Sequence, residues 1–438
     1  GNANNVSGVM IIDNEYGKVL TGTRTFGSIP AGGNAQSAGD YVVMVSPDCP
    51  DGYLLPFEIA ITADGTDEVM SVAEIMVNSP TLTVTGITID DAGGNNNGLL
   101  DPGETANVIL DVQNNGNEDA IELNGILDTG DAYLTITDID GSFGDIPEGQ
   151  ARNNSGNPFT ITADSDIFEG RKCQLMMTVS NSAGMSSEVP FTIEIGEISA
   201  DDPVGPDDYG YYIYDNTDTD YSIVPTYEWV GIEDSGTRVA NGDDETDIAF
   251  IPFDFVYYGN VYRHITICSN GFAALDTAVV DQGGNHWALF FNWPMPDPGG
   301  PGGMIAPFWD DLNGGSGTGI FYDYDTENHR FIISWDHIRT AWYSGSAYES
   351  FEIIIYDANY YPTVTGDCRI EFMYEDISDS DGDENYSTVG FESFDEHDGL
   401  EYVFCRYYDD GAASLVDGRS LLITTNTGRG RVNGQATL

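Results

Sequence analysis

Basic residues are scarce in this chain. Its 438 residues hold 14 Lys and Arg against 73 Asp and Glu, a formal net charge of -59. A surface of this sign repels nucleic acid and anionic lipid, so we expect neither as a partner. It suits divalent cations, an extracellular or high-salt setting, or a cationic partner. Solubility alone is the simpler explanation of the charge.

Long apolar runs are absent too. No stretch of 18 apolar residues exists, which argues against a membrane-spanning helix. The sequence shows no signal peptide and starts at Gly1 without Met, so we expect a mature, processed or fragmentary chain. The cysteines form no CxxC pair, which argues against a metal–thiolate site. One or two disulfides remain open among Cys49, Cys173, Cys268, Cys368 and Cys405.

Catalytic signatures are also missing. The chain has neither a GxSxG elbow nor an HExxH helix, and its five histidines are scattered. Cys268 lies at an even offset from His264, and His329 and His337 flank one strand, but such spacings are more typical of structural and surface residues. Carboxylates are too numerous for their count to exclude a glycosidase pair. We expect a protein that is not an enzyme.

Strand signals dominate what is present. Gly and Tyr are abundant, with 52 and 25 residues, and helical periodicity is hard to find. Alternating runs such as Arg330–Trp335 and Ser350–Tyr356 predict strands. The predicted fold class is all-β, with three tandem β-sandwich domains. The first two are immunoglobulin-like, and the third is a larger, jelly-roll-like sandwich.

An internal repeat defines the first two domains. The segment Phe26–Gly32 recurs as Phe143–Gly149, and Val6–Val9 recurs as Leu123–Ile126 at the same offset. A repeat of this length predicts two tandem sandwiches of one family, at residues 1–79 and 80–197.

The repeat also predicts that the first copy is incomplete. Gly1 falls opposite Glu118, so the first copy has no counterpart of the strand 82–89, the acidic loop 90–104 or the strand 106–112. A sandwich short of two strands leaves open backbone edges and an open core. The chain could be a piece of a longer polypeptide, a neighbouring subunit could donate the strands, or the first copy could be a smaller variant. We favour donation by a neighbour.

The rest of the chain has a different composition. Residues 198–208 are acidic and rich in Pro and Gly, which predicts a linker. Residues 209–427 are rich in aromatics and alternating strands, which predicts one large sandwich. The tail 428–438 carries Arg429 and Arg431, and would be either a basic hook for an acidic neighbour or a frayed end.

The acidic loop predicts a calcium site. Its side chains offer six oxygen ligands, and Gly93, Gly94 and Gly98 let the backbone fold around an ion. A solvated acidic turn is the alternative. The predicted ligands are Asp90, Asp91, Asn95, Asn97, Asp101 and Glu104, with a second predicted set of Asp379, Asp381 and Asp383. Weaker sets are Asp215, Asn216, Asp218 and Asp220, and Asp243, Asp244, Glu245 and Asp247.

Several segments resemble known families. Asn95–Glu104, Phe143–Pro147 and Cys49–Gly52 resemble the immunoglobulin-like modules that follow the catalytic domain of secreted bacterial peptidases, including gingipain-like enzymes and subtilases. The large domain resembles a β-sandwich module appended to secreted bacterial proteins, through Ile251–Phe255, Ile267–Phe272 with its SNG, Ala306–Leu312 (APFWDDL) and Val389–Glu392. Both resemblances imply extracellular, non-catalytic attachment or structural domains.

The sequence therefore predicts a secreted, calcium-stabilised structural or adhesive protein. The favoured hypothesis is a subunit of a surface filament or layer that self-associates by strand donation into residues 1–79. The non-catalytic C-terminal region of a secreted peptidase is the first alternative. The second is a carbohydrate-binding module with a cell-surface or glycan partner, for which Trp287 and Trp293 on a predicted loop would be the contact residues.

Overall fold

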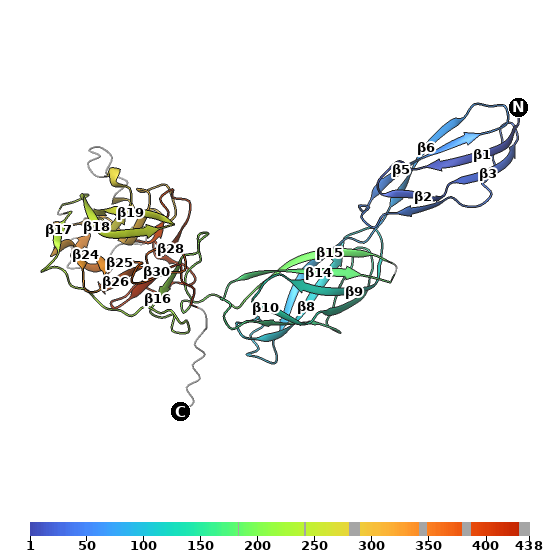
Figure 1. The fold of residues 1–438 in the computed structure, drawn as a ribbon. Helices are drawn as coiled ribbons and strands as arrows, with labels where there is room; N and C mark the ends of the chain where they lie inside the picture. The colour runs from blue at the N-terminus through green and yellow to red at the C-terminus, as the bar shows by residue number, and fades with distance from the viewer. Residues whose placement is uncertain (183, 241, 280–289, 341–347, 379–386, 429–438) are drawn as a thin grey trace. The chain divides into compact units, whose positions relative to one another are not determined.

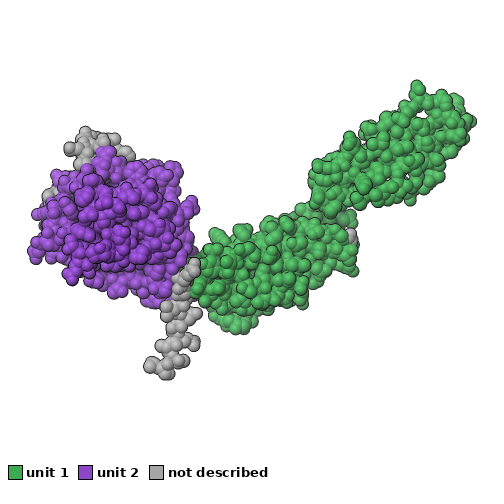
Figure 2. Space-filling view, in the orientation of Figure 1, with its two compact units in different colours: residues 1–197 green, residues 198–438 purple. Residues whose placement is uncertain are grey.

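The computed structural model describes residues 1–438 apart from 183, 241, 280–289, 341–347, 379–386 and 429–438. The described residues form strands β1 to β30 and a short 3-10 helix, η1 (Thr277–Val279), so the all-β prediction is confirmed. They contain no helix that is long and apolar enough to span a membrane. The chain divides into two compact units, Gly1–Glu197 and Ile198–Leu438 (Figures 1 and 2).

The first unit contains two sandwiches, which share no strand pairing among the described residues. The second sandwich lies at residues 80–197. It pairs a five-stranded sheet, β10-β13-β8-β12 with β7 beside β8, with a four-stranded sheet, β11-β9-β14-β15. Its strands are β7 (Leu82–Asp90), β8 (Thr105–Asn114), β9 (Ala120–Thr129), β10 (Leu134–Asp138), β11 (Asp140–Ile146), β12 (Ala151–Asn153), β13 (Phe159–Ala163), β14 (Lys172–Ser180) and β15 (Ser186–Glu194).

Strand alternation builds the core of this second sandwich. Along β8 and β14, every second residue is buried and its neighbours face outward. The inward residues of both sheets form one apolar cluster that includes Val108, Leu110, Phe143, Phe159 and Met177. This is the pattern of two sheets packed face to face.

The first sandwich, residues 1–79, has fewer strands. Its four-stranded sheet, β3-β1-β5-β6, matches β11-β9-β14-β15 of the second sandwich. Facing it is a two-stranded sheet, β2-β4, which matches β10-β13. The bounds are β1 (Ala3–Ile11), β2 (Gly17–Thr21), β3 (Thr23–Ile29), β4 (Val42–Val45), β5 (Tyr53–Thr62) and β6 (Val69–Val77).

The second unit is one large sandwich. An eight-stranded sheet, β16-β30-β26-β25-β24-β23-β17 with β22 beside β24, faces a seven-stranded sheet, β18-β19-β20-β21-β27-β28-β29. Their bounds are β16 (Tyr212–Asp215), β17 (Thr237–Val239), β18 (Thr246–Tyr257), β19 (Asn260–Cys268), β20 (Phe272–Ala274), β21 (Met304–Trp309), β22 (Leu312–Asn313), β23 (Gly319–Asp325), β24 (Arg330–Thr340), β25 (Glu349–Tyr356), β26 (Ile370–Asp376), β27 (Thr388–Glu392), β28 (Gly399–Phe404), β29 (Tyr407–Tyr408) and β30 (Ser420–Thr424).

Aromatic side chains fill the core of the large sandwich. Trp335 stacks on Phe351, which stacks in turn on Phe308, and all three are buried. The segment 198–208, predicted as a linker, lies within this unit. Its Val204 is buried and pairs with Ile213, so part of the segment packs on the sandwich.

Candidate functional site

The inner surface of the first sandwich is the most unusual feature of the described chain. In the second sandwich, the four-stranded sheet is covered by five strands. In the first, a sheet of the same width is covered by β2 and β4 alone. Apolar residues point inward from the four-stranded sheet of each copy, so the missing cover leaves apolar surface exposed in the first sandwich.

The second sandwich shows what fills this space in a complete copy. Strand β8 runs antiparallel to β13, with Val108 opposite Phe159 and Ala106 opposite Ile161. Strand β7 pairs with the other edge of β8 and lies against β15. None of the six strands of the first sandwich takes either of these two places.

The exposed fractions of matching residues in the two sandwiches show the effect of the missing strands. Ile75 on β6 is 37% exposed, whereas its counterpart Ile193 is 3% exposed. Val45 on β4 is also 37% exposed, and its counterpart Ala163 is 1% exposed. We call the inward-facing, incompletely covered residues of the first sandwich the open face: Phe26, Val43, Val45, Phe57, Ile59, Ile61 and Ile75. Their counterparts, all buried, are Phe143, Ile161, Ala163, Leu175, Met177, Val179 and Ile193.

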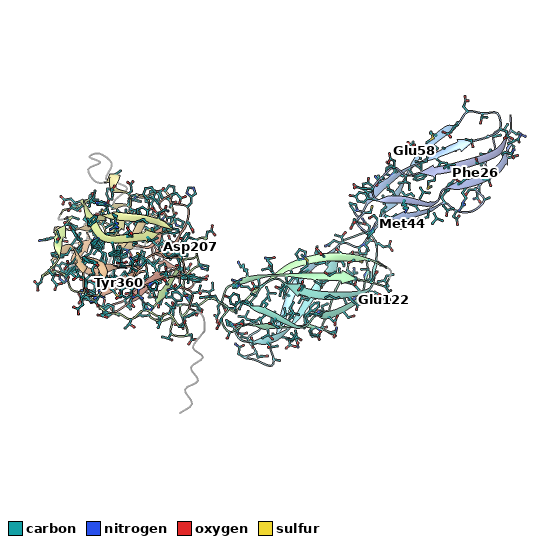
Figure 3. All side chains as sticks on the ribbon, in the orientation of Figure 1. Phe26, Met44, Glu58, Glu122, Asp207 and Tyr360 are labelled. Atoms are coloured by element: carbon teal, nitrogen blue, oxygen red, sulfur yellow. The ribbon has the colours of Figure 1, made fainter. Side chains whose placement is uncertain are left out.

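One part of the first sandwich is closed without any added strand. Met10, Cys49 and Leu55 are buried there. The hydroxyl of Tyr41 donates to the carbonyl of Gly8 at 3.2 Å and so links the two sheets. The sheets approach so closely here that a Cβ on Gly8 would lie 2.7 Å from the Tyr41 hydroxyl. The first sandwich is therefore a folded half-open structure, and Figure 3 labels Phe26 and Met44 on its two sheets.

Two strand edges border the open face. Strand β4 pairs with β2 on one side, and β6 pairs with β5 on one side; neither has a second partner among the described strands. Unpaired edges of this kind are templates for another strand. The open face therefore combines an apolar surface with unpaired backbone donors and acceptors.

Strand β6 is apolar on both of its faces. Val69, Val72 and Met76 are 61%, 68% and 62% exposed, and no residue of the strand is fully buried. In β15, by contrast, Val189, Phe191 and Ile193 are buried and alternate with Pro190 and Thr192, which are not. Strand β6 thus lacks the alternation of buried and exposed residues that β15 has.

The acidic loop of the second sandwich is held by its own carboxylates. Asp91 is buried, and its two oxygens accept the N–H groups of Asn97 and Gly98 at 2.8 and 3.2 Å. Glu104 accepts the N–H groups of Asn95 and Asp101 at 3.2 and 3.1 Å. Crowded carboxylates repel one another, and these hydrogen bonds offset part of that cost.

The side-chain amides complete the same loop. Asn95 and Asn97 both donate to Asp101 Oδ2, at 2.6 and 2.9 Å. A Cβ on Gly94 would overlap the Glu104 carboxylate, which explains the glycine at that position. Asp90 accepts the N–H of Ala92 at 3.4 Å. Five of the six predicted ligands are thus brought together by direct hydrogen bonds.

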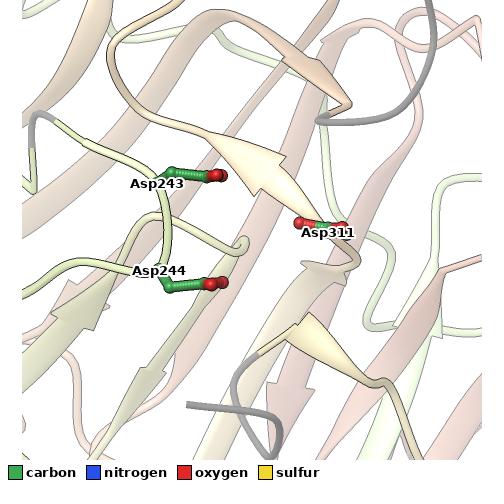
Figure 4. Close-up of side chains that lie close together, drawn as sticks. All are labelled: Asp243, Asp244 and Asp311. Atoms are coloured by element: carbon green, nitrogen blue, oxygen red, sulfur yellow. The ribbon is translucent and has the colours of Figure 1, made fainter. Parts of the chain in front are cut away.

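A different trio gathers in the large sandwich. Asp243, Asp244 and Asp311 each place a carboxylate oxygen within 4.8 Å of the others, the one such group of three among the described residues (Figure 4). Burial raises the pKa of Asp243, and the charge of Asp244 adds to the shift. The sequence predicted Asp243 and Asp244 but missed Asp311, which the bridge between Asp243 and Asn313 brings alongside.

The other predicted sets of metal ligands differ in their surroundings. Asp379, Asp381 and Asp383 lie outside the described residues. Asp215 is paired with Arg419 at 3.1 Å, and Asn216 accepts from the same guanidinium at 2.8 Å, so these two oxygens are already engaged. Burial, together with the charges of Asp215, Asp202 and Asp201, raises the pKa of Asp218 to about 8. Asp247 accepts the N–H of Ala240 at 2.7 Å.

The candidate catalytic residues have structural surroundings. Cys268 is fully buried, and burial raises the pKa of its thiol to about 12, the reverse of what a nucleophile needs. His264 packs edge-on against Phe250, whereas His329 and His337 stack on Tyr360 and Tyr348. Trp293 is partly buried and packs against a small apolar cluster that includes Met295 and Met304, and Trp287 lies outside the described residues.

Comparisons with known proteins add one family match. A family model described as NIDO related matches residues 220–407, inside the large sandwich. No curated protein matches the chain. Two crystal structures of the major pilin subunit of Bacillus cereus, one of them a point variant, are 10% and 11% identical to this chain. They cover 61% and 60% of it, and 86% and 82% of their own chains, with a TM-score of 0.16 for each.

Proposed function

We propose that this protein is a non-catalytic structural or adhesive subunit that acts outside the cell. In this proposal, copies associate into a surface filament or layer, and a neighbouring copy supplies the strands that the first sandwich lacks. The open face is the observation that carries the proposal, because its seven apolar residues have buried counterparts in the second sandwich. The extracellular setting rests on the acidic surface and the tandem sandwiches.

Filling the open face would stabilise the assembly in two ways. Covering apolar surface contributes about 25 cal/mol for each Å² removed from water. Pairing the free edges of β4 and β6 adds backbone hydrogen bonds to this gain. A partner that fills the open face would therefore be held by both the side chains and the main chain, which is the basis of strand addition between proteins.

We also propose that calcium stabilises the acidic loop of the second sandwich. The support is the convergence of Asp91, Asp101 and Glu104 with the amides of Asn95 and Asn97 in one short loop. Each of these carboxylates uses only part of its capacity for backbone and amide N–H groups, and the remaining lone pairs suit a hard cation.

Assembly of the full chain tests the structural function. We expect purified protein to form polymers in light scattering and negative-stain electron microscopy. Ile75→Asp places a charge on the open face and should reduce assembly at least tenfold, because the charge would be buried without a partner. Met76→Asp, on the outward face of the same strand, is the matched control and should assemble normally.

Two outcomes would contradict the proposal. One is a monodisperse monomer at all concentrations and salt strengths. The other is a polymer that forms equally well with Ile75→Asp, because the open face would then play no part in it. Both substituted residues are already exposed, and circular dichroism of each variant confirms that it is folded.

A further inference from the structure

We propose that residues 223–232 form a pH-responsive strap over the outer face of the eight-stranded sheet, closed while the Glu352 carboxyl is protonated and released when it is ionised. This segment is called the strap below. It belongs to the large sandwich, so its role is independent of the open face and goes beyond the proposed function. When the strap is closed, it covers an apolar surface of the sheet.

The eight-stranded sheet is apolar on both of its faces. Along β24 and β25, residues such as Ile333 and Ile353 point into the core between the two sheets. The residues that alternate with them belong to a second apolar cluster on the outer face, which contains Phe321, Ile332, Ile354, Tyr356 and Met373. Because an apolar face is destabilised by contact with water, this outer cluster requires a cover.

The strap provides that cover. It contains no strand or helix, and its Tyr227, Trp229 and Val230 pack against the outer cluster. Within the part of the chain that the structure describes, one hydrogen bond joins the strap to the sheet: the N–H of Val230 donates to Glu352 Oε1 at 2.9 Å. The closed strap therefore depends on apolar contacts and on a single carboxyl group.

Glu352 lies beneath the strap with no exposed surface. It is opposite Ser334 of β24 and Met373 of β26, and its exposed fraction is 0%. Its Oε2 has no hydrogen-bond partner among the described residues, and none of the ion pairs between them includes Glu352. A charged carboxylate at this position would be buried and only half satisfied, which costs far more than burying the neutral acid.

The groups around Glu352 do not offset a negative charge. Burial is the main reason why the pKa of Glu352 lies well above its usual range, and the charges of Glu375 and Glu371 raise it further. Arg330 acts in the opposite direction, but its guanidinium is bonded to Asp325 at 3.0 Å. The charged and titratable groups on this side of the sheet are Arg330 and Asp336 of β24, Tyr356 of β25, Arg369 just ahead of β26, Glu371 and Glu375 of β26, Tyr227 and Glu228 of the strap, Glu233 just after it, and Asp417.

Opening of the strap brings water to Glu352 and so lets it ionise. Between the pKa of a solvated glutamate, about 4.3, and the raised pKa of the buried one, the closed form holds one proton more than the open form. In that window the closed strap loses stability as the pH rises, and the equilibrium constant for opening increases about tenfold per pH unit. The strap is thus held most tightly in acid and is released progressively toward alkaline pH.

Amide hydrogen exchange of the full chain between pH 6 and pH 8, followed by mass spectrometry, tests this role. After correction for the intrinsic effect of pH on exchange, the protection of peptides that span Val230 should fall about a hundredfold over this range. Peptides from β25, beneath the strap, should keep their protection. An equal loss in the strap and in β25 would mean that the whole sandwich opens, and would overturn the inference.

Matched variants identify the group that titrates. Glu352→Gln stays neutral at every pH and keeps an oxygen for the N–H of Val230, so protection of its strap should not depend on pH. Glu392→Gln removes another buried carboxyl, on β27 of the opposite sheet, and should leave the response of the strap unchanged.

A third variant keeps the test valid if Glu352→Gln does not fold. Glu352→Met removes the ionisable group without burying a new amide, and protection of its strap should also be independent of pH. A pH dependence that persists without the Glu352 carboxyl, or strap protection that does not change with pH in the native chain, would contradict the inference.

Discussion

Glu392 is a buried carboxyl without full hydrogen bonding in the large sandwich. Its Oε2 accepts the N–H of Asp297 at 3.2 Å, and its Oε1 has no partner among the described residues. Burial, followed by the charges of Glu396 and Asp297, raises the pKa of Glu392 to about 8. The folded protein thus holds a proton that the unfolded chain releases near pH 4.

This proton gives a pH dependence with a definite sign. The stabilisation is complete below the pKa of the unfolded glutamate and is lost as the pH rises through about 8. We expect Glu392→Gln to reduce the fall in unfolding free energy between pH 6 and pH 8.5 by about 2 kcal/mol, measured by urea denaturation. Glu327→Gln, at an exposed site, is the control. An unchanged pH dependence in Glu392→Gln would show that this carboxyl is ionised in the fold.

Single residues also show what sequence reasoning could and could not reach. The repeat identified the absence of two strands, since that follows from aligning Phe26–Gly32 with Phe143–Gly149. The alignment could not show that the hydroxyl of Tyr41 bonds to the carbonyl of Gly8 and closes one part of the first sandwich. This contact depends on how closely the two sheets approach each other. Asp311 was missed for the same reason: strand β22, which adjoins it, reaches Asp243 through a pairing far apart in sequence.

At the scale of elements, the acidic loop is the second feature that the sequence predicted in outline. Composition alone indicated a turn with many oxygen atoms, and the structure adds the order of its hydrogen bonds. Asp91 and Glu104 each accept two backbone N–H groups, which fixes the path of the loop backbone around these two carboxylates. Which carboxylate faces which amide could not be read from composition, because several arrangements satisfy the same residues.

Removal of calcium should weaken the first unit. We expect an excess of chelator to lower its midpoint of thermal unfolding by several degrees, since a loss of 1 kcal/mol shifts a unit of this size by about 2–4 °C. Added calcium should restore the midpoint, and Asp101→Asn should reduce the response, because Asp101 is the acceptor shared by Asn95 and Asn97. An unchanged midpoint, with no metal in elemental analysis, would leave the loop as a hydrogen-bonded turn.

Strand β6 differs from its counterpart in the second sandwich, strand β15. In β15, buried apolar residues alternate with exposed or half-buried ones, as expected of a strand with one face on the core. In β6, the sequence VMSVAEIMV is apolar on both faces and exposed on both. The extended conformation of β6 was predictable from its residues, and the repeat indicated that two strands are missing. That β6 is the strand left without cover was visible only from its position in the sheet.

For the whole molecule, charge and association act against each other. A net charge of -59 makes two copies repel at long range, and this repulsion falls as salt rises. The open face is an apolar region within this acidic chain, so association through it requires close contact rather than long-range attraction. Assembly by this route should be faster at moderate salt than at low salt.

We propose that the open face of the first sandwich is filled by strands from a neighbour in the assembled protein. A cryo-electron microscopy reconstruction of the native particle tests it most directly. We expect two extended strands from an adjacent subunit, one antiparallel along the free edge of β4 and the other over the inward face of β6. A reconstruction in which this face stays bare, or is covered by a segment of the same chain, would contradict the claim.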